Sequence, residues 1–226
     1  MTNSAPNTNE LIDLSHRIFD GLVTYKGLPA PIMCDYLSRE KSKEIYGNDY
    51  QVQIGKIEMV SNTGTYLDSP FHFDENGADL AALSLELLAN LPAVLVDVKD
   101  QIKIDVDTFT GVDVAGKAVL VYTNWSQHWD SEQYFENHAY LTEQAAQWLV
   151  ANGAKLVGID SHNIDDTRGK LRPVHKHLLG NDVLIVEHMT NLARLPKNGF
   201  RFFAVPPKIT GVGTFPVRAF AQVVVP

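Results

Sequence analysis

Six short apolar runs constrain the fold of this chain more than any other feature. Each is rich in Val, Leu, Ile, Ala or Phe, and each gives way to polar residues or proline. Runs of this length and composition are typical of buried strands. Because they hardly alternate with polar residues, we expect a sheet that is covered on both faces. The predicted strands are 91–98, 118–122, 155–159, 183–186, 200–205 and 217–225.

Two segments have the pattern of helices. Residues 141–152 gather apolar side chains on one side, with Thr142 as N-cap and Gly153 as C-cap. Residues 79–89, with the sequence DLAALSLELLA, form the second predicted helix. The order helix, glycine, strand over 141–162 is typical of a β-α-β unit. We therefore expect the α/β class with a mixed sheet.

Length and composition indicate a globular chain. Of the 226 residues, 45% are hydrophobic and 20% are charged, as in an average folded domain. Residues 1–10 are polar and are expected to form a flexible tail. No Gly/Ser/Pro-rich linker divides the rest, so we expect a single domain over 11–226.

Charge, cysteine count and hydropathy exclude several classes of function. The formal net charge of −8 argues against nucleic acid or an anionic membrane as partner. The single cysteine, Cys34, allows neither an intrachain disulfide nor a Cys-rich zinc site. No stretch approaches 18 apolar residues and no signal-peptide pattern is present, so a cytoplasmic location is expected.

The densest polar segment is 61–73. It places Asn62, Tyr66, Asp68 and His72 within eleven residues, and its glycine and proline disfavour a regular helix. A carboxylate four residues from an imidazole can orient it or share a metal ion with it. Two interpretations stay open: a functional site, or a polar loop with a capping aspartate and a hydrogen-bonded histidine.

Ligand-type residues also follow the predicted strands. His175 and Glu187 are separated by a loop and a strand, so only the fold can bring them together, and their spacing alone is weak evidence for a metal site. Asp160 and the turn 123–125 also lie at strand ends. Functional groups collect beyond strand ends in open α/β sheets, although every strand must also meet water somewhere.

The segment 62–73, NTGTYLDSPFHF, resembles the signature HxGTHxDxPxHF of the cyclase family of metal-dependent hydrolases, of the bacterial kynurenine formamidase type. The resemblance continues in order through most of the chain, roughly over 11–221, which makes it more specific than any single motif. The further matching segments are DLSH at 13–16, VYTNW at 121–125, LVGID at 156–160, HxxLL at 175–179, VExxTNL at 186–192, PPKI at 206–209 and PVR at 216–218.

The resemblance implies a swivelling β/β/α domain around a mixed sheet, assembled as a homodimer or higher homo-oligomer. It also implies arylformamidase-like chemistry, the metal-assisted hydrolysis of an amide, lactam or lactone in a small-molecule substrate. In that chemistry a divalent ion, zinc or manganese, polarises the carbonyl and generates hydroxide. Trp125 and Phe19 are the candidates for contacts with an aromatic substrate.

The resemblance assigns roles to four residues that match the family pattern. Asp68 and Glu187 would be carboxylate ligands of the metal, and His175 would be its imidazole ligand. His72, the last histidine of the signature, would be the general acid/base. Three protein ligands plus water fit a catalytic zinc or manganese centre.

Two positions depart from the signature, because Asn62 and Tyr66 stand where the family has histidines that bind one of the metals. An amide oxygen is a weaker ligand than imidazole, and a tyrosine binds a metal only after its phenol, with a pKa near 10, loses its proton. We therefore expect one divalent ion rather than two, and a site without metal stays open. Without a cation, Asp68 and Glu187 would repel each other and one would take up a proton.

Two alternatives follow from these departures. The first is a metal-independent lyase, dehydratase or isomerase on the same scaffold, in which Asn62 binds the substrate and Tyr66 joins His72 in acid/base catalysis. The second is a small-molecule binding protein that kept the pocket and lost the chemistry.

Overall fold

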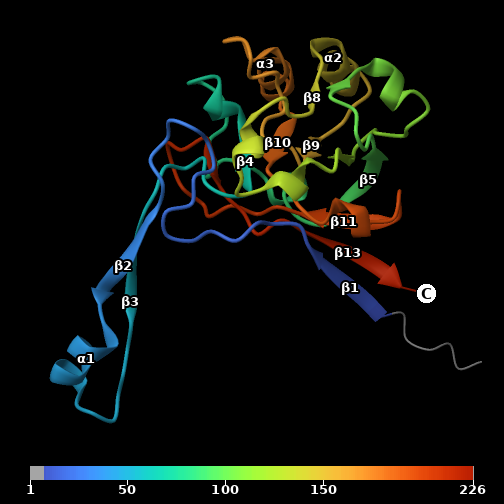
Figure 1. The fold of residues 1–226 in the computed structure, drawn as a ribbon. Coiled ribbons are helices and arrows are strands. Elements are labelled where there is room, and N and C mark those ends of the chain that lie inside the picture. The colour runs from blue at the N-terminus through green and yellow to red at the C-terminus, as the bar shows by residue number, and fades with distance from the viewer. Residues whose placement is uncertain (1–7, 226) are drawn as a thin grey trace, which may run out of the picture.

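The strands predicted from the apolar runs lie together in one mixed sheet (Figure 1). The computed structural model describes residues 8–225. Four parallel strands form the centre of the sheet, and antiparallel strands extend it on both sides. The nine strands of this sheet in the described residues are, in spatial order, β1 (Thr8–Asp13), β13 (Phe220–Val225), β11 (Phe200–Phe203), β5 (Leu91–Asp97), β7 (Ala118–Tyr122), β9 (Leu156–Ile159), β10 (Leu184–Glu187), β4 (Tyr66–Asp68) and β12 (Thr214–Pro216). The predicted fold class is confirmed.

The central strand β7 shows why the apolar runs are continuous. Its side chains point alternately to the two faces of the sheet, and both faces are covered. Val119 and Val121 join the core cluster that includes residues of α2 and α3. Ala118 and Leu120 join the cluster on the other face, and all four side chains are fully buried.

Three α-helices occur in the described residues: α1 (Arg39–Tyr46), α2 (Glu143–Ala151) and α3 (Pro173–Leu179). The prediction of α2 is confirmed, and the Thr142 side chain caps it by accepting a hydrogen bond from the Ala145 amide at 3.1 Å. Both α2 and α3 pack against one face of the sheet (Figure 1). None of the helices in the described chain is long and apolar enough to cross a membrane.

The prediction of a helix over 79–89 is wrong. This segment consists of turns and the short 3-10 helix η2 (Leu85–Leu87). Asp79 accepts hydrogen bonds from the Ala82 amide at 3.0 Å and from the Gly211 amide at 2.7 Å. These contacts, one of them with a distant loop, compete with regular helical hydrogen bonding.

A hairpin arm extends from the body of the molecule (Figure 1). We define the arm as β2 (Ile32–Leu37), α1 and β3 (Ile54–Glu58), and its two strands pair only with each other among the described residues. A second small sheet joins β6 (Lys103–Ile104) to β8 (Tyr140–Leu141). The remaining short 3-10 helices are η1 (Pro70–His72), η3 (Val106–Phe109), η4 (Trp125–His128), η5 (Glu132–Phe135) and η6 (Leu192–Arg194).

The start of the chain differs from the expected tail. Residues 8–10 belong to β1, whose backbone pairs antiparallel with β13 from Thr8 opposite Val225 to Asp13 opposite Phe220. The pairing supplies the ordering that the polar composition of 1–10 did not indicate. Residues 1–7 of the predicted tail lie outside the described residues.

Candidate active site

Strand pairing brings the two acidic residues of the predicted site together. In the antiparallel register of β4 and β10, Tyr66 lies opposite Glu187 and Asp68 lies opposite Ile185. Tyr66 and Asp68 are two residues apart on one strand, so their side chains leave the same face of the sheet. Both Asp68 and Glu187 are fully buried. The convergence expected from the sequence is therefore present.

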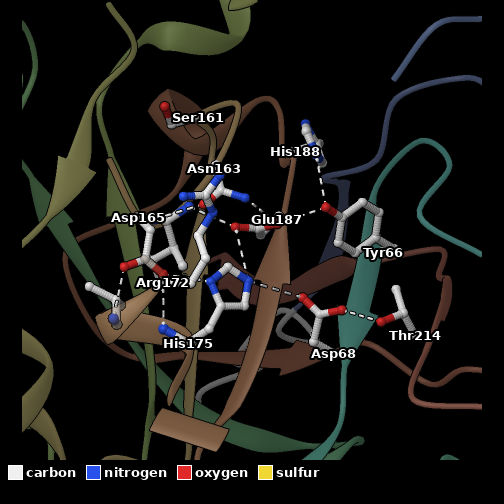
Figure 2. A network of polar contacts seen from close by, with 12 residues as sticks. Tyr66, Asp68, Ser161, Asn163, Asp165, Arg172, His175, Glu187, His188 and Thr214 are labelled. Atoms are coloured by element: carbon white, nitrogen blue, oxygen red, sulfur yellow. Dashed lines mark hydrogen bonds and ion pairs between the residues drawn. The ribbon is translucent and has the colours of Figure 1, made fainter. Parts of the chain in front are cut away.

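His175 completes this group from α3 (Figure 2). Its Nε2 atom lies 3.7 Å from an oxygen of Asp68 and 3.7 Å from an oxygen of Glu187. These distances are too long for hydrogen bonds, and they leave the imidazole and the two carboxylates facing a common point. Nε2 therefore lies near both carboxylates without a hydrogen bond to either.

Asp165 fixes the orientation of His175. One Asp165 oxygen lies 2.7 Å from Nδ1 of His175 and accepts its backbone amide at 3.0 Å, while the other accepts the Val174 amide at 2.8 Å. The carboxylate therefore caps the first turn of α3 and accepts a hydrogen bond from Nδ1. This arrangement turns Nε2 towards Asp68 and Glu187, as carboxylates that accept from metal-binding histidines do in many metal sites.

Asp68 keeps one oxygen free. The Thr214 hydroxyl donates a hydrogen bond to Oδ1, because β12 places Thr214 directly opposite Asp68 (Figure 2). The buried Oδ2 atom has no hydrogen-bond partner among the described residues. A buried carboxylate oxygen without a donor is costly unless something outside the chain satisfies it.

His72 lies near Asp68 and His175. It is the last residue of η1, which begins at Pro70, and its side chain is exposed. One ligand atom from each of Asp68, His72 and His175 can be chosen so that all lie within 4.8 Å of one another. One carboxylate and two imidazoles form a donor set that suits zinc or manganese, so the residues fit a divalent ion.

The pKa shifts of the buried group follow from two carboxylates that lie beside one imidazole. Burial lowers the pKa of His175, but Glu187, Asp165 and Asp68 outweigh it and raise that pKa to about 10. Burial raises the pKa of Glu187 to about 7; the charge of His175 opposes this shift and that of Asp68 adds to it. A proton on His175 or a bound cation would each compensate the two carboxylates.

Tyr66 stands where the family signature has a histidine. Its hydroxyl donates a hydrogen bond to Glu187 Oε2 at 2.7 Å, and Glu187 Oε1 accepts from the Ile164 amide at 2.6 Å. Burial and the charges of Glu187 and Asp68 raise the Tyr66 pKa well above its usual value. Tyr66 is therefore a neutral hydrogen-bond donor and not a phenolate ligand.

Behind Tyr66 lies a hydrogen-bonded pair, His188 and Tyr134, which the sequence did not single out. His188 Nε2 lies 3.3 Å from the Tyr66 hydroxyl, and His188 Nδ1 lies 2.9 Å from the Tyr134 hydroxyl. Because Tyr66 donates to Glu187, Nε2 of His188 donates to Tyr66 and Nδ1 accepts from Tyr134. All of these side chains are buried, so the contacts hold Tyr66 in place.

A cavity of about 410 Å³ opens over this group. Its wall includes Asn62, Tyr66, His72, His175 and Glu187, which the sequence analysis had singled out. A cavity of this size suits a small organic molecule.

Trp125 and Phe19 are not part of this wall. The Trp125 indole N–H donates to the Tyr134 carbonyl at 3.0 Å, which turns the ring towards the η5 segment. Phe19 is 41% exposed on the surface. The expectation that they contact the substrate finds no support in the cavity.

The polar strand ends divide into two kinds. Asp160 accepts hydrogen bonds from the Thr123 amide and hydroxyl and from the Asn124 amide, at 2.6–3.0 Å. These contacts tie the end of β9 to the end of β7 and are structural. Among the strand ends singled out, only that at Glu187 borders the cavity.

A comparison of the chain with known proteins identifies its relatives. The sequence model of the Cyclase family matches residues 12–166. The chain belongs to the Cyclase family. The kynurenine formamidase of Bacillus cereus is 28% identical over 212 residues, covering 94% of this chain and 97% of that protein.

Solved structures of other proteins have the same fold. A potential metal-dependent hydrolase with cyclase activity superposes with a TM-score of 0.79 at 26% identity, over 97% of this chain and 100% of that one. Isatin hydrolase A from Labrenzia aggregata superposes with a TM-score of 0.82 at 20% identity, over 96% and 94% of the two chains. The resemblance inferred from the signature is confirmed at the level of family and fold.

Proposed function

We propose that this Cyclase-family protein is a metal-dependent hydrolase that cleaves an amide, lactam or lactone bond of a small substrate, in the manner of an arylformamidase. One observation carries the proposal: a buried Asp68 oxygen without a hydrogen-bond donor lies 3.7 Å from the fixed Nε2 of His175. The similarity to kynurenine formamidases supports an amide as the bond that is cleaved.

In this proposal Asp68, His175 and Glu187 hold one divalent ion, zinc or manganese. When bound, such an ion polarises a carbonyl and lowers the pKa of a coordinated water towards 7. Asp165 accepts a hydrogen bond from Nδ1 of His175 and so directs Nε2 towards Asp68, and Tyr66 holds Glu187 by its hydrogen bond. Asn62 lies in the cavity wall, where its amide can bind polar atoms of the substrate.

His72 is proposed as the general acid/base. Its exposed imidazole borders the cavity and can exchange protons with water, and imidazole is the most frequent proton carrier at neutral pH. Its proximity to Asp68 and His175 supports a second assignment, as a ligand. The His72→Ala variant separates the two roles. If His72 is the acid/base, the variant keeps the metal and loses turnover; if His72 is a ligand, the variant loses both.

The activity test uses protein purified without chelator and a panel of formanilides, isatin and simple lactones. We expect turnover that a chelator abolishes and that zinc or manganese restores. His72→Ala should lose at least about a hundredfold in kcat, while His128→Ala, on the η4 segment, should keep its activity. Absence of turnover across the panel with metal-loaded protein contradicts the proposal.

Metal-independent chemistry is the second candidate, and the neutral phenol of Tyr66 favours it. A lyase, dehydratase or isomerase on this scaffold would pair Tyr66 with His72 and keep full activity in chelator. A small-molecule binder would show thermal stabilisation by a ligand without any turnover. Restoration of activity by metal after chelator treatment rules out both.

Assembly and location belong to the same proposal. The arm exposes the apolar side chains of Tyr36, Ile45 and Ile57, which are 77%, 64% and 61% accessible. An isolated two-stranded hairpin is marginally stable in water. A homodimer or higher homo-oligomer in which a second copy of the chain buries these side chains would stabilise the arm. Light scattering should give a multiple of the chain mass. A cytoplasmic location stays a prediction.

A further inference from the structure

The cavity wall contains a cation that the proposed chemistry does not use. Arg172 is the residue before α3, and three residues later the same helix presents His175. Arg172 is half-buried and lines the cavity together with His72 and Glu187. Figure 2 shows the Arg172 side chain among those of the site.

The backbone holds the guanidinium of Arg172 in place. Nη1 donates to the carbonyl oxygens of Gly169 and Leu171, each at 2.9 Å, and Nη2 lies 3.5 Å from the Tyr25 hydroxyl. Nε donates to no residue in the described part of the chain. The edge formed by Nε and Nη2 is the side of the fork that binds a carboxylate through two parallel hydrogen bonds.

No carboxylate among residues 8–225 forms an ion pair with Arg172. Its neighbours differ in this respect: Arg168 pairs with Asp166 at 2.7 Å, and Lys26, in the same cavity wall, pairs with Glu132 at 2.7 Å. Glu187, the acidic residue of the cavity wall, accepts hydrogen bonds from the Tyr66 hydroxyl and the Ile164 amide. Asp68 and Glu187 face His175, Thr214 and Tyr66.

We infer that Arg172 is a specificity residue that binds a carboxylate of the substrate, so that the bond cleaved belongs to an N-acylated amino acid or aminoaryl acid. This inference rests on the proposed hydrolase function. The metal group would act on the acyl carbonyl while Arg172 holds the acidic end. A pre-ordered guanidinium loses little entropy on binding and prefers a planar, bidentate anion.

The test compares matched formamides that differ only in charge: 3-formamidobenzoate with 3-formamidobenzamide, and 3-(3-formamidophenyl)propanoate with its carboxamide. For the preferred pair, wild-type protein should favour the carboxylate by about ten- to hundredfold in kcat/KM, mostly through KM. In Arg172→Gln this preference should fall to about one. Arg168→Gln, which removes a neighbouring arginine that is already paired, should keep the wild-type preference.

Arg172→Lys is a second variant in case Arg172→Gln misfolds. It keeps the positive charge and lacks the planar guanidinium that binds a carboxylate through two hydrogen bonds. Its preference should lie between those of wild type and Arg172→Gln. A wild type that does not prefer carboxylates, or an Arg172→Gln variant that keeps the preference, overturns the inference.

If wild-type protein hydrolyses no member of the panel, the proposed function fails while the inference can still be decided by binding. Calorimetry would then compare 3-aminobenzoate with 3-aminobenzamide, and 3-(3-aminophenyl)propanoate with its carboxamide. At least tenfold tighter binding of a carboxylate to wild type, lost in Arg172→Gln, supports the inference. Equal binding of both members of each pair overturns it.

Discussion

At the scale of single residues, Asp165 determines what His175 can do. Its carboxylate accepts a hydrogen bond from Nδ1 and directs Nε2 towards Asp68. We predict that Asp165→Asn lowers the affinity for zinc or manganese by about ten- to hundredfold. Competition with a chromophoric chelator measures this change. Asp166→Asn, one residue on and paired with Arg168 at the surface, is the control, and equal affinities in both variants would count against the role of Asp165.

The identities of Asn62 and Tyr66 limit the number of metal ions. Because the family signature has histidines at both positions, we predict that the double variant Asn62→His/Tyr66→His binds two equivalents of metal where the wild type binds one. Imidazole supplies a lone pair at neutral pH, whereas the buried phenol of Tyr66 keeps its proton. Elemental analysis after dialysis gives the ratio, and a single equivalent in the double variant would refute this explanation.

Buried neutral histidines make the fold sensitive to acid. His162 is only 3% exposed, and burial is the largest of the causes that lower its pKa to about 3. The unfolded chain takes up a proton on this side chain near pH 6.5 and the folded chain does not, so stability is lost as the pH falls below 6.5. Between pH 6.5 and 5.0 this residue should cost about 2 kcal/mol.

Urea unfolding at pH 6.5 and 5.0 measures this effect. His162→Phe removes the titrating group and keeps the ring among its aromatic neighbours, Tyr25 and Tyr134. The variant should therefore lose less stability than wild type over the same pH interval. An equal loss in the two proteins would show that His162 does not contribute.

At the scale of elements, the turn that carries His72 is positioned by a glycine from another segment. A Cβ atom on Gly213 would lie 2.5 Å from the His72 amide nitrogen and 2.7 Å from its Cα, so the η1 backbone would have to move. We predict that Gly213→Ala lowers turnover at least about tenfold, because displacements near 1 Å at a reacting group are costly. Its free energy of unfolding should fall by about 1–3 kcal/mol.

Gly55→Ala is the matched control for this substitution. Gly55 lies in β3 of the arm, and an added Cβ would meet only the flexible Gln53 side chain, at 3.4 Å. Activity assays and urea unfolding of both variants provide the comparison. Wild-type turnover in Gly213→Ala would contradict the close packing of Gly213 against His72.

The elements that could be predicted are those whose signal is local. The buried strands follow from their own apolar runs, and α2 follows from its apolar side and the Thr142 cap. The arm and α3 could not be predicted in this way. α3 has seven residues, and the aspartate that accepts its first amides is Asp165, which lies well upstream of the helix. The helix prediction for 79–89 fails for a related reason, because Asp79 accepts a hydrogen bond from a distant loop.

At the scale of the whole molecule, the site joins residues from both halves of the chain through the sheet. Asp68 and His72 could be found in one motif, whereas their relation to Glu187 depends on the pairing of β4 with β10. Arg172 and Asp165 were missed because neither belongs to a motif. The polar stretch that follows β9 is the sequence feature that could have pointed to Asp165. Nothing in the sequence points to Arg172 before the cavity is known.

Asp68 and His175 are proposed to hold one divalent ion inside this fold. Calorimetric titration of metal-free protein with zinc and with manganese tests it most directly, using wild type, Asp68→Asn and the surface control Asp74→Asn. We predict one equivalent per chain for wild type and for the control with at least one of the two metals, and at least tenfold weaker binding of that metal in Asp68→Asn. Absence of binding to wild type, or equal binding in all three proteins, would contradict the claim.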